Sequence, residues 1–310
     1  MDTLAVVLEE PKRLSLTRVE LADPGEEDVV VDIEWSGVST GTERLLYDGR
    51  MPPFPGMGYP LVPGYESVGR IVAAGARAKR EIGTRVFVPG SRGFGAVRGL
   101  FGGAAARVVA PAARAMPIGE ALGERGVLLA LAATGYHAFA DADPPDLIIG
   151  HGVLGRLIAR LALASGAAPV VHEKNPIRRE GAKGYEVVDP QDDPRDDYQT
   201  ICDVSGDPAI LDRLIARLAP GGEIVLAGFY EAPLSFAFPA AFMREARIRV
   251  AAQWLPHELS AVRAMAEAGA LNLDGLITHR SLADGVGAAY ATAFTDPSCL
   301  KMIIDWRSRT

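Results

Sequence analysis

The chain has 310 residues, of which 48% are hydrophobic and 23% charged, so it has the composition of a soluble globular protein and the length for two domains. Its formal net charge of −7 argues against a nucleic-acid partner, because no basic surface would attract phosphate backbones. The first residues lack a signal peptide's basic start and apolar core, and no apolar run is long enough to cross a membrane. We therefore expect no transmembrane segment and a cytoplasmic protein that has at most peripheral contact with membranes.

Residues 1–118 are predicted to form a small β-barrel-like domain. Apolar and polar side chains mostly alternate from Val29 to Trp35, which is the pattern of a half-buried strand. Shorter apolar runs follow at 67–73, 85–89 and 107–110, separated by glycine and proline. Many short strands with turn signals between them are typical of a barrel.

Within this domain, residues 48–64 are too rich in proline and glycine for regular structure. The segment also carries Met51, Phe54, Met57 and Tyr59. Two interpretations remain open. The segment is either a surface loop with its own small apolar cluster or a lid over an apolar substrate.

Residues 119–142 are predicted to be helical, and the stretch after them organises the rest of the chain. It contains a short apolar strand, a Gly-x-Gly-x-x-Gly turn, an amphipathic helix that stops near Gly166, a second strand and an acid. The first strand covers residues 147–149, the turn 150–155, the helix 154–165 and the second strand 170–171, and the acid is Glu173.

This unit has the arrangement of a dinucleotide-binding site. Gly150 permits the tight turn, Gly152 leaves room for a pyrophosphate, and Gly155 lets the helix pack closely on the strand. The helix amino terminus then directs unpaired N–H groups at the phosphates. We assign the remaining turn residues, His151, Val153 and Leu154, to the same site. A tight turn with no ligand is the alternative, and the His151 imidazole is as readily a spectator as a catalyst.

Glu173 indicates which dinucleotide binds. It follows the first glycine at about the spacing of 20 residues expected for the ribose-binding acid. A carboxylate there accepts from the ribose hydroxyls and repels a 2′-phosphate, which favours NAD over NADP. Lys174, which we place in the cofactor site, and Arg178 and Arg179 keep NADP open, because they could hold a phosphate if they turned inward.

The later elements extend this unit into a doubly wound parallel sheet, because strands and helices alternate at the expected spacing. The predicted strands are 185–189, 200–205, 223–229 and 247–254, with a helix at 209–218 that ends near Pro220-Gly221-Gly222. The tail, residues 256–310, holds a predicted helix at 259–268 and a last strand at 302–306.

Four motifs together resemble the medium-chain dehydrogenase/reductase superfamily, the alcohol dehydrogenase-like proteins. They are Ser36–Glu43, Gly64–Gly69, Gly150–Gly155 and Leu276–Arg280. The resemblance covers essentially the whole chain and implies an α/β oxidoreductase. In this layout a GroES-like β-barrel catalytic domain, residues 1–118 and 256–310, surrounds a Rossmann NAD-binding domain, residues 119–255. It also implies a homodimer in which the sixth strand, around Ile248–Ala252, pairs with its mate.

The departures from that superfamily point to its zinc-free branch. The three zinc-ligand positions hold Ser39 or Thr40, then Tyr65, and then Ala130. These residues do not make a tetrahedral zinc site. The two cysteines, Cys202 and Cys299, are too few for the four-cysteine zinc lobe, and the spacing of the histidines does not suit a metal.

Three stretches resemble a narrower family, the bacteriochlorophyllide a dehydrogenases of bacteriochlorophyll biosynthesis in photosynthesis. They are SGVSTGTE at 36–43, PPFPGMGYPLVPGYESVGR at 52–70 and GHGVLGRL at 150–157. This resemblance implies oxidation of the 3-(1-hydroxyethyl) group of a tetrapyrrole to 3-acetyl, with hydride transfer to NAD. Two alternatives remain open: a zinc-free NAD(P)H quinone or enoyl reductase, against which Glu173 counts, and a nucleotide-binding protein without catalysis.

Without zinc, another group must polarise the alcohol. Tyr65 stands at a metal-ligand position, so its hydroxyl is a candidate hydrogen-bond partner, or acid/base if its pKa is lowered. By family analogy Glu66, Thr42 and Glu43 lie nearby and relay the proton. The alternatives are that Tyr65 packs into an empty metal cavity and that Glu43 and Glu66 form structural ion pairs.

The resemblance places further residues around the cofactor. Thr134 should lie beside the nicotinamide, and Gly228 and Phe229 should offer backbone groups to its carboxamide. Ser205 and Gly206 should lie near the adenosine ribose. All of these residues except Thr134 lie at the carboxyl ends of predicted strands, which is where parallel sheets bind ligands.

We predict that the purified protein carries no stoichiometric zinc, because the three expected ligand positions hold residues that bind zinc weakly or not at all. Metal analysis of protein prepared without chelators checks this. A value of one zinc per chain would contradict it.

Overall fold

The computed structural model describes residues 1–53 and 55–309 and confirms the predicted α/β class. Phe54, part of the apolar cluster predicted in the 48–64 segment, lies outside the described residues. Within the described part of the chain, no helix has both the length and the apolarity needed to cross a membrane.

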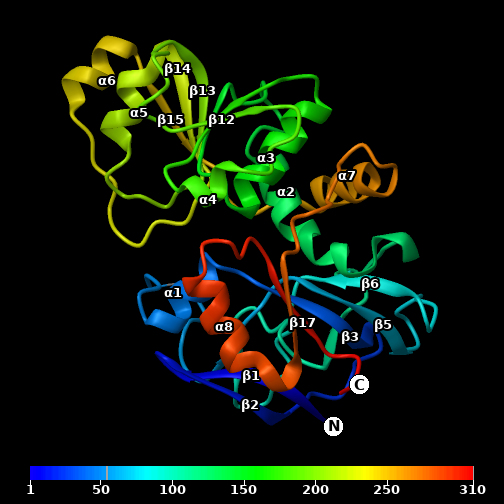
Figure 1. The fold of residues 1–310 in the computed structure, drawn as a ribbon. Coiled ribbons are helices and arrows are strands. Elements are labelled where there is room, and N and C mark those ends of the chain that lie inside the picture. The colour runs from blue at the N-terminus through cyan, green and yellow to red at the C-terminus, as the bar shows by residue number, and fades with distance from the viewer. Residues whose placement is uncertain (54, 310) are drawn as a thin grey trace. The chain divides into compact units, whose positions relative to one another are not determined.

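The chain divides into two compact units, drawn in Figure 1. One comprises Met1–Ala130 and Asp274–Thr310, and the other comprises Leu131–Leu273. Both boundaries fall later in the chain than the sequence suggested. The first moves because the 3₁₀ helix η1 (Glu120–Leu128) packs on strands of the first unit. The second moves because α7 (Pro256–Glu267) is bound to the second unit, where His137 Nδ1 lies 2.9 Å from a Glu258 carboxylate oxygen.

The first unit is built on two sheets. Its larger sheet has the order β16-β17-β3-β5-β6-β9, with β8 also paired to β3, and its smaller sheet has the order β2-β1-β4-β7. The strands are β1 (Asp2–Glu10), β2 (Arg13–Glu20), β3 (Asp28–Val38), β4 (Leu61–Val62), β5 (Ser67–Ala74), β6 (Arg85–Val88), β7 (Arg98–Gly99), β8 (Arg107–Pro111), β9 (Met116–Pro117), β16 (His279–Leu282) and β17 (Met302–Asp305). The helices of this unit are α1 (Thr42–Asp48), α8 (Val286–Thr295) and the short 3₁₀ helix η2 (Ala283–Gly285).

Strand β3 lies at the centre of the first unit because three strands, β5, β8 and β17, pair with it. The predicted alternation is visible in its burial, since Val31 and Ile33 are buried while Asp32 and Glu34 are partly exposed. Val30 is buried as well, because both faces of this central strand are covered. The carboxyl end of β3 thereby becomes a fixed point for the residues that follow it.

The second unit contains one parallel sheet of order β12-β11-β10-β13-β14-β15. This is the strand order of the predicted doubly wound fold, with the switch point between β10 and β13. Its strands are β10 (Leu147–Ile149), β11 (Val170–His172), β12 (Glu186–Val188), β13 (Tyr198–Asp203), β14 (Leu218–Leu226) and β15 (Arg247–Val250). Besides α7, its helices are α2 (Leu129–His137), α3 (Val153–Ala164), α4 (Pro176–Arg179), α5 (Leu211–Arg217) and α6 (Phe238–Arg244).

Three local predictions need correction. The helical stretch 119–142 is broken, because Gly123 has φ 49° and ψ −132° and α2 ends at His137. The Pro220-Gly221-Gly222 sequence, predicted to end a helix, lies inside β14, which takes up the extra residues through a register shift against β13. The 48–64 segment includes a two-residue strand, β4, which pairs with β1 and β7.

Candidate active site

The Tyr65 hydroxyl lies in a group of hydroxyls at the ends of two strands of the first unit. Ser39 follows β3 directly, and its Oγ lies 2.8 Å from the Tyr65 hydroxyl. The Thr42 side chain also hydrogen-bonds to Tyr65. The half-buried Tyr65 ring packs edge-on against Phe101, with ring centroids 5.6 Å apart. The structure thus brings together two of the predicted residues, Tyr65 and Thr42, and adds Ser39.

The hypothesis that the Tyr65 pKa is lowered is wrong. Burial raises the pKa of this phenol, and the negative charge of Glu66 raises it further, while the hydrogen bonds from Ser39 and Thr42 act the other way. Tyr65 therefore remains protonated near neutral pH. It can donate a hydrogen bond or exchange one proton for another, but it does not stand ready as a charged base.

Glu43 lies in the first turn of α1 and is fully enclosed. One carboxylate oxygen accepts from the Ser39 backbone N–H at 2.9 Å, and the other accepts from the Tyr290 hydroxyl of α8 at 2.7 Å. Burial raises the pKa of Glu43 to about 7, against the opposing effect of these two bonds. Glu43 contacts the backbone of Ser39 and not its hydroxyl, so these bonds do not form a continuous side-chain path from Tyr65 to Glu43.

Glu66 forms a buried ion pair, the alternative considered for it from the sequence. The Lys301 ammonium donates to both of its carboxylate oxygens, at 2.9 and 2.7 Å, and to the Val38 carbonyl at 3.2 Å. Burial raises the pKa of Glu66, and the Lys301 charge opposes this rise. Gly37 is required here, because a Cβ atom at that position would lie 2.1 Å from a Glu66 oxygen. The carboxylate therefore positions β5 and β3 rather than facing the Tyr65 hydroxyl group.

The residues at the family's metal position do not fit zinc. Ser39 and Tyr65 direct their hydroxyls at each other, and Ala130 offers no donor atom. Protein zinc sites use thiolate, imidazole or carboxylate ligands. Across residues 1–53 and 55–309, no three His, Cys, Asp or Glu side chains are grouped so that they could hold a metal ion.

In the second unit, the glycine turn has the geometry that a bound pyrophosphate requires. Gly150 has φ 102°, which suits glycine, and a Cβ atom on Gly155 would lie 1.9 Å from the Gly150 carbonyl oxygen. Gly152 faces open space, with no atom within 4 Å of where its Cβ would be. Because α3 begins at Val153, its first N–H groups lie directly after this open position.

Glu173, the residue predicted to bind the ribose, holds the glycine turn. Its two carboxylate oxygens accept from the backbone N–H groups of His151, at 2.9 Å, and Asn175, at 2.8 Å. Each oxygen keeps a second lone pair, so hydroxyl donors can still bind. Of the basic residues that follow, Lys174 is exposed, and Arg179 pairs with Asp189 at 2.8 Å.

The His151 side chain turns away from the glycine turn and into the protein. Its Nδ1 lies 2.6 Å from the Arg178 carbonyl and its Nε2 lies 2.8 Å from the Tyr185 hydroxyl. Burial lowers the pKa of His151 to about 4, so the ring is neutral, with Nδ1–H donating to the carbonyl and Nε2 accepting from Tyr185. The buried Arg156 guanidinium joins the same segment by donating to the carbonyls of residues 151, 178 and 180. The imidazole therefore supports the turn.

The carboxyl ends of β13 and β14 bring the remaining predicted residues together. Asp203 accepts from the Ser205 N–H at 3.0 Å, and its carbonyl accepts from the Gly228 N–H at 3.0 Å. Gly206 has φ 72° and approaches the Phe229 carbonyl. Sequence reasoning missed Asp203, which is fully buried and bonded to Tyr230 at 2.5 Å. Thr134 lies in α2 of the same unit.

Comparison with known proteins matches this architecture. Residues 25–120 fit the alcohol dehydrogenase GroES-like domain family. The chain is 57% identical to the 2-desacetyl-2-hydroxyethyl bacteriochlorophyllide A dehydrogenase of Rhodobacter capsulatus, over 99% of both chains. The chain belongs to this dehydrogenase family. The resemblance drawn from the motifs is confirmed, and so are the dehydrogenase class and the GroES-like part of the predicted fold.

Solved structures share the whole fold. An alcohol dehydrogenase from E. coli CFT073 in complex with NADH aligns with a TM-score of 0.83 and 21% identity, over 98% of this chain and 99% of that one. A dehydrogenase from Sinorhizobium meliloti 1021 bound to NADP aligns with a TM-score of 0.82 and 21% identity, with the same coverage. The likeness extends through both units, so the predicted combination of a GroES-like domain with a Rossmann domain is confirmed.

The buried Glu43 should make stability depend on pH. It binds its proton more tightly in the folded chain than in the unfolded chain, so its contribution is fully present below pH 4.5 and is lost as pH rises through about 7. As pH rises through this range, the unmodified chain should lose about 3 kcal/mol of unfolding free energy that Glu43→Gln does not lose. Urea unfolding between pH 5 and 8 measures it, with Glu26→Gln at an exposed site as control. Parallel profiles for Glu43→Gln and the unmodified chain would contradict the assignment.

Glu173→Ser should weaken NAD more than NADP, because it removes both the acceptor for the ribose hydroxyls and the charge that repels a 2′-phosphate. We expect the preference for NAD to fall roughly tenfold or more, as for loss of a hydrogen bond to a charged group. Titration with the reduced forms, NADH and NADPH, whose dihydronicotinamide ring fluoresces, measures the ratio. Glu180→Ser, at an exposed acid of the same segment, is the matched control. Equal losses for both cofactors would mean that Glu173 only holds the turn.

Proposed function

We propose that this chain is an NAD-dependent, zinc-independent dehydrogenase of bacteriochlorophyll biosynthesis. Its reaction would oxidise a secondary alcohol, the hydroxyethyl group of a bacteriochlorophyllide, to an acetyl group. This group is numbered 2 in the relative's name and 3 in current tetrapyrrole nomenclature. The observation that carries the proposal is the 57% identity over 99% of both chains to a dehydrogenase of that name.

The second unit is suited to hold the cofactor. The turn around Gly152 and the amino terminus of α3 would receive the pyrophosphate, and Glu173 the adenosine ribose. Ser205, Gly206, Gly228, Phe229 and Thr134 remain the proposed contacts to the rest of the dinucleotide. Nicotinamide, when bound, supplies the hydride acceptor for alcohol oxidation. Glu173 and the pairing of Arg179 with Asp189 support NAD rather than NADP.

Tyr65 is the proposed contact to the substrate oxygen. Its hydroxyl remains protonated and has partners in Ser39 and Thr42. The alcohol proton would pass to the Tyr65 oxygen as the Tyr65 proton passes to Ser39 or Thr42, and that hydroxyl would release its own proton to water. One proton then leaves for each hydride transferred, and no tyrosinate is needed. This arrangement fits a site that lacks metal ligands, since the hydroxyls would hydrogen-bond to the alcohol oxygen and carry its proton in place of the polarisation that a metal ion supplies.

The two alternative interpretations are less well supported. A quinone or enoyl reductase would be expected to prefer NADPH, whereas Glu173 stands at the ribose position. A binding protein without catalysis would not need a hydroxyl group at the family's metal position, where Tyr65 and Ser39 lie 2.8 Å apart. Incubation with NAD and 3-hydroxyethyl bacteriochlorophyllide decides the matter, because the long-wavelength absorption band shifts when an acetyl group conjugates with the macrocycle. No shift with either NAD or NADP would contradict the proposal.

We also propose a cytoplasmic homodimer joined along β15, the edge strand of the second unit's sheet. The edge presents Ile248 and Val250, the latter 72% exposed. The preceding helix α6 exposes Phe238, Phe242 and Met243. An open apolar edge invites strand pairing, and a second copy would cover it.

Tyr65→Phe should lower the oxidation rate by roughly 10²- to 10⁴-fold, the typical worth of a positioned acid or base. NAD affinity and thermal stability should hardly change, because the ring still packs against Phe101 and the cofactor residues lie in the other unit. Steady-state kinetics, cofactor titration and a melting curve separate these effects. Full activity in Tyr65→Phe would assign Tyr65 to packing and move the proton transfer to Thr42.

The unmodified protein should be a dimer at micromolar concentration by light scattering. Val250→Asp should shift it towards monomer, because a buried, unpaired carboxylate would disfavour the joined edge. Leu282→Asp is the matched control, since Leu282 is an exposed leucine on β16, the edge strand of the first unit's larger sheet. A monomeric unmodified protein would contradict the proposal.

A further inference from the structure

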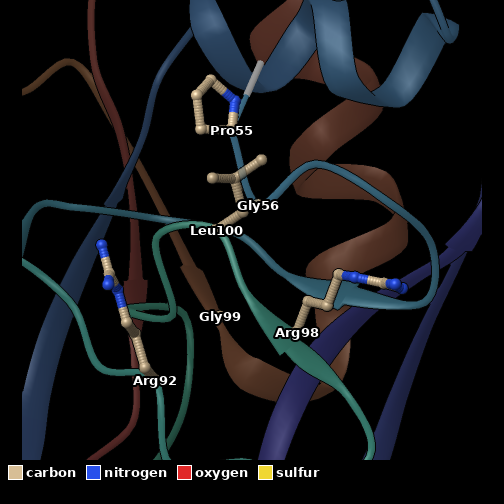
Figure 2. A pocket seen from close by; sticks show the side chains of 6 residues that line it. All are labelled: Pro55, Gly56, Arg92, Arg98, Gly99 and Leu100. Carbon is tan, nitrogen blue, oxygen red and sulfur yellow. The ribbon is translucent and has the colours of Figure 1, made fainter. Parts of the chain in front are cut away.

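A cavity of about 400 Å³ lies in the first unit, and Tyr65 is not among the residues that line it. Six residues from two segments line it: Pro55, Gly56, Arg92, Arg98, Gly99 and Leu100. Figure 2 shows the Leu100 side chain between the two arginines and directed towards Pro55 and Gly56. The lining thus combines a small apolar surface with two positive charges.

Both arginines lack an acidic partner in the described part of the chain. Among the described residues, no carboxylate forms an ion pair with Arg92 or Arg98, although most arginines of this chain are so paired. The chain as a whole carries a net charge of −7, so two unneutralised cations at one cavity stand out against the rest of the protein. Unpaired guanidinium groups at a cavity are suited to bind a carboxylate in bidentate fashion.

The position of Arg98 is fixed by the fold. It lies on β7, which pairs with β4, and its guanidinium donates to the Tyr59 carbonyl at 3.3 Å. Gly58 leaves room for it, because a Cβ atom at that position would come within 2.8 Å of the guanidinium carbon. The Tyr59 hydroxyl is in turn bonded to the Leu46 carbonyl of α1. One of the two charges is therefore held in place before any ligand binds.

Arg92 adds positive charge on the other side of the cavity (Figure 2). Arg92 also interacts with Arg114. Burial lowers the pKa of Arg114, and the like charge of Arg92 lowers it further. Arg114 donates to the Pro89 carbonyl at 3.3 Å. This region therefore holds three guanidinium groups, and an anion there would relieve their mutual repulsion.

The cavity is joined to the proposed reaction site through two adjacent residues. Leu100 lines the cavity, and the next residue, Phe101, packs its ring against Tyr65. A molecule with its reacting group at the Tyr65 hydroxyl and a second group at the arginines would therefore contact one continuous segment of chain. A large planar ligand that carries an anionic side chain has this form.

We infer that this cavity binds the carboxylate of the substrate's propionate side chain through Arg92 and Arg98. The inference rests on the proposed function, since it names how that substrate is oriented. A bacteriochlorophyllide carries its propionate as a free acid, whereas the bacteriochlorophyll formed from it carries an ester. The two arginines then select the free acid and turn the macrocycle so that its hydroxyethyl group faces Tyr65. Oxidation must accordingly precede the reaction that esterifies this side chain.

The test compares two substrates that differ only in this group: 3-hydroxyethyl bacteriochlorophyllide and its propionate methyl ester. The unmodified protein should use and bind the acid better than the ester by roughly ten- to a hundredfold, the range for a hydrogen bond to a charged group. Arg98→Gln and Arg92→Gln should each reduce this ratio, and the double variant should bring it close to one, through losses on the acid alone. Arg77→Gln, an exposed arginine beside Glu26, should leave the ratio unchanged.

Binding is measured separately from turnover, by the change in tetrapyrrole absorption when protein is added without cofactor. If the unmodified protein oxidises acid and ester equally well, the proposed function stands and the carboxylate site is overturned. If it binds the acid selectively through the arginines but oxidises neither compound, the site stands and the proposed function fails. If the arginine variants lost activity and binding equally for acid and ester, the carboxylate site would also be overturned. Melting curves would then show whether those losses come from unfolding of the variants.

Discussion

The buried ion pair between Lys301 and Glu66 is the interaction on which the first unit depends. Lys301 contacts Glu66 and the Val38 carbonyl, and the chain neighbours of these two partners are Tyr65 and Ser39, whose hydroxyls lie 2.8 Å apart. A single ammonium group therefore adds a side-chain link between the ends of β3 and β5, which also pair through their backbones. Isolated charges at this depth would be strongly unfavourable, so each partner requires the other. The positions of the Tyr65 and Ser39 hydroxyls thus depend on an ion pair that takes no part in their hydrogen bonds.

Around this pair, the site contains little charge near neutral pH. Burial keeps the Tyr65 phenol protonated and brings the pKa of Glu43 to about 7, while the charges of the neighbouring ion pair, Glu66 and Lys301, neutralise each other. A family position that elsewhere holds a metal is occupied here by groups that can exchange protons without gaining net charge. The cationic groups of this unit's cavity, Arg92 and Arg98, lie on a separate segment. In the proposed reaction, substrate binding and proton movement therefore use different parts of the sequence.

The second unit could be predicted well because its signals are local. The glycine turn, the helix after it and Glu173 all follow from short-range spacing, and the strand order agrees with the prediction. The partners in the first unit could not be found in this way. Lys301 is 235 positions from Glu66, and Tyr290 is 247 from Glu43, so no periodicity links them. His151 shows a third limit: its place in the turn suggested a ligand contact, whereas its hydrogen-bond partners at residues 178 and 185 determine where its ring points.

The discontinuity of the first unit has a consequence for how the chain is made. Strands β3 and β5 leave the ribosome long before β16, β17 and Lys301, so the larger sheet stays incomplete and Glu66 lacks its partner until the segment that contains Lys301 has been made. The second unit is continuous from Leu131 to Leu273, and all six of its strands emerge before the last segment does. A nascent chain stalled before residue 301 would therefore carry a folded second unit and an open first one. The cluster of hydroxyls from Ser39, Thr42 and Tyr65 would be assembled last.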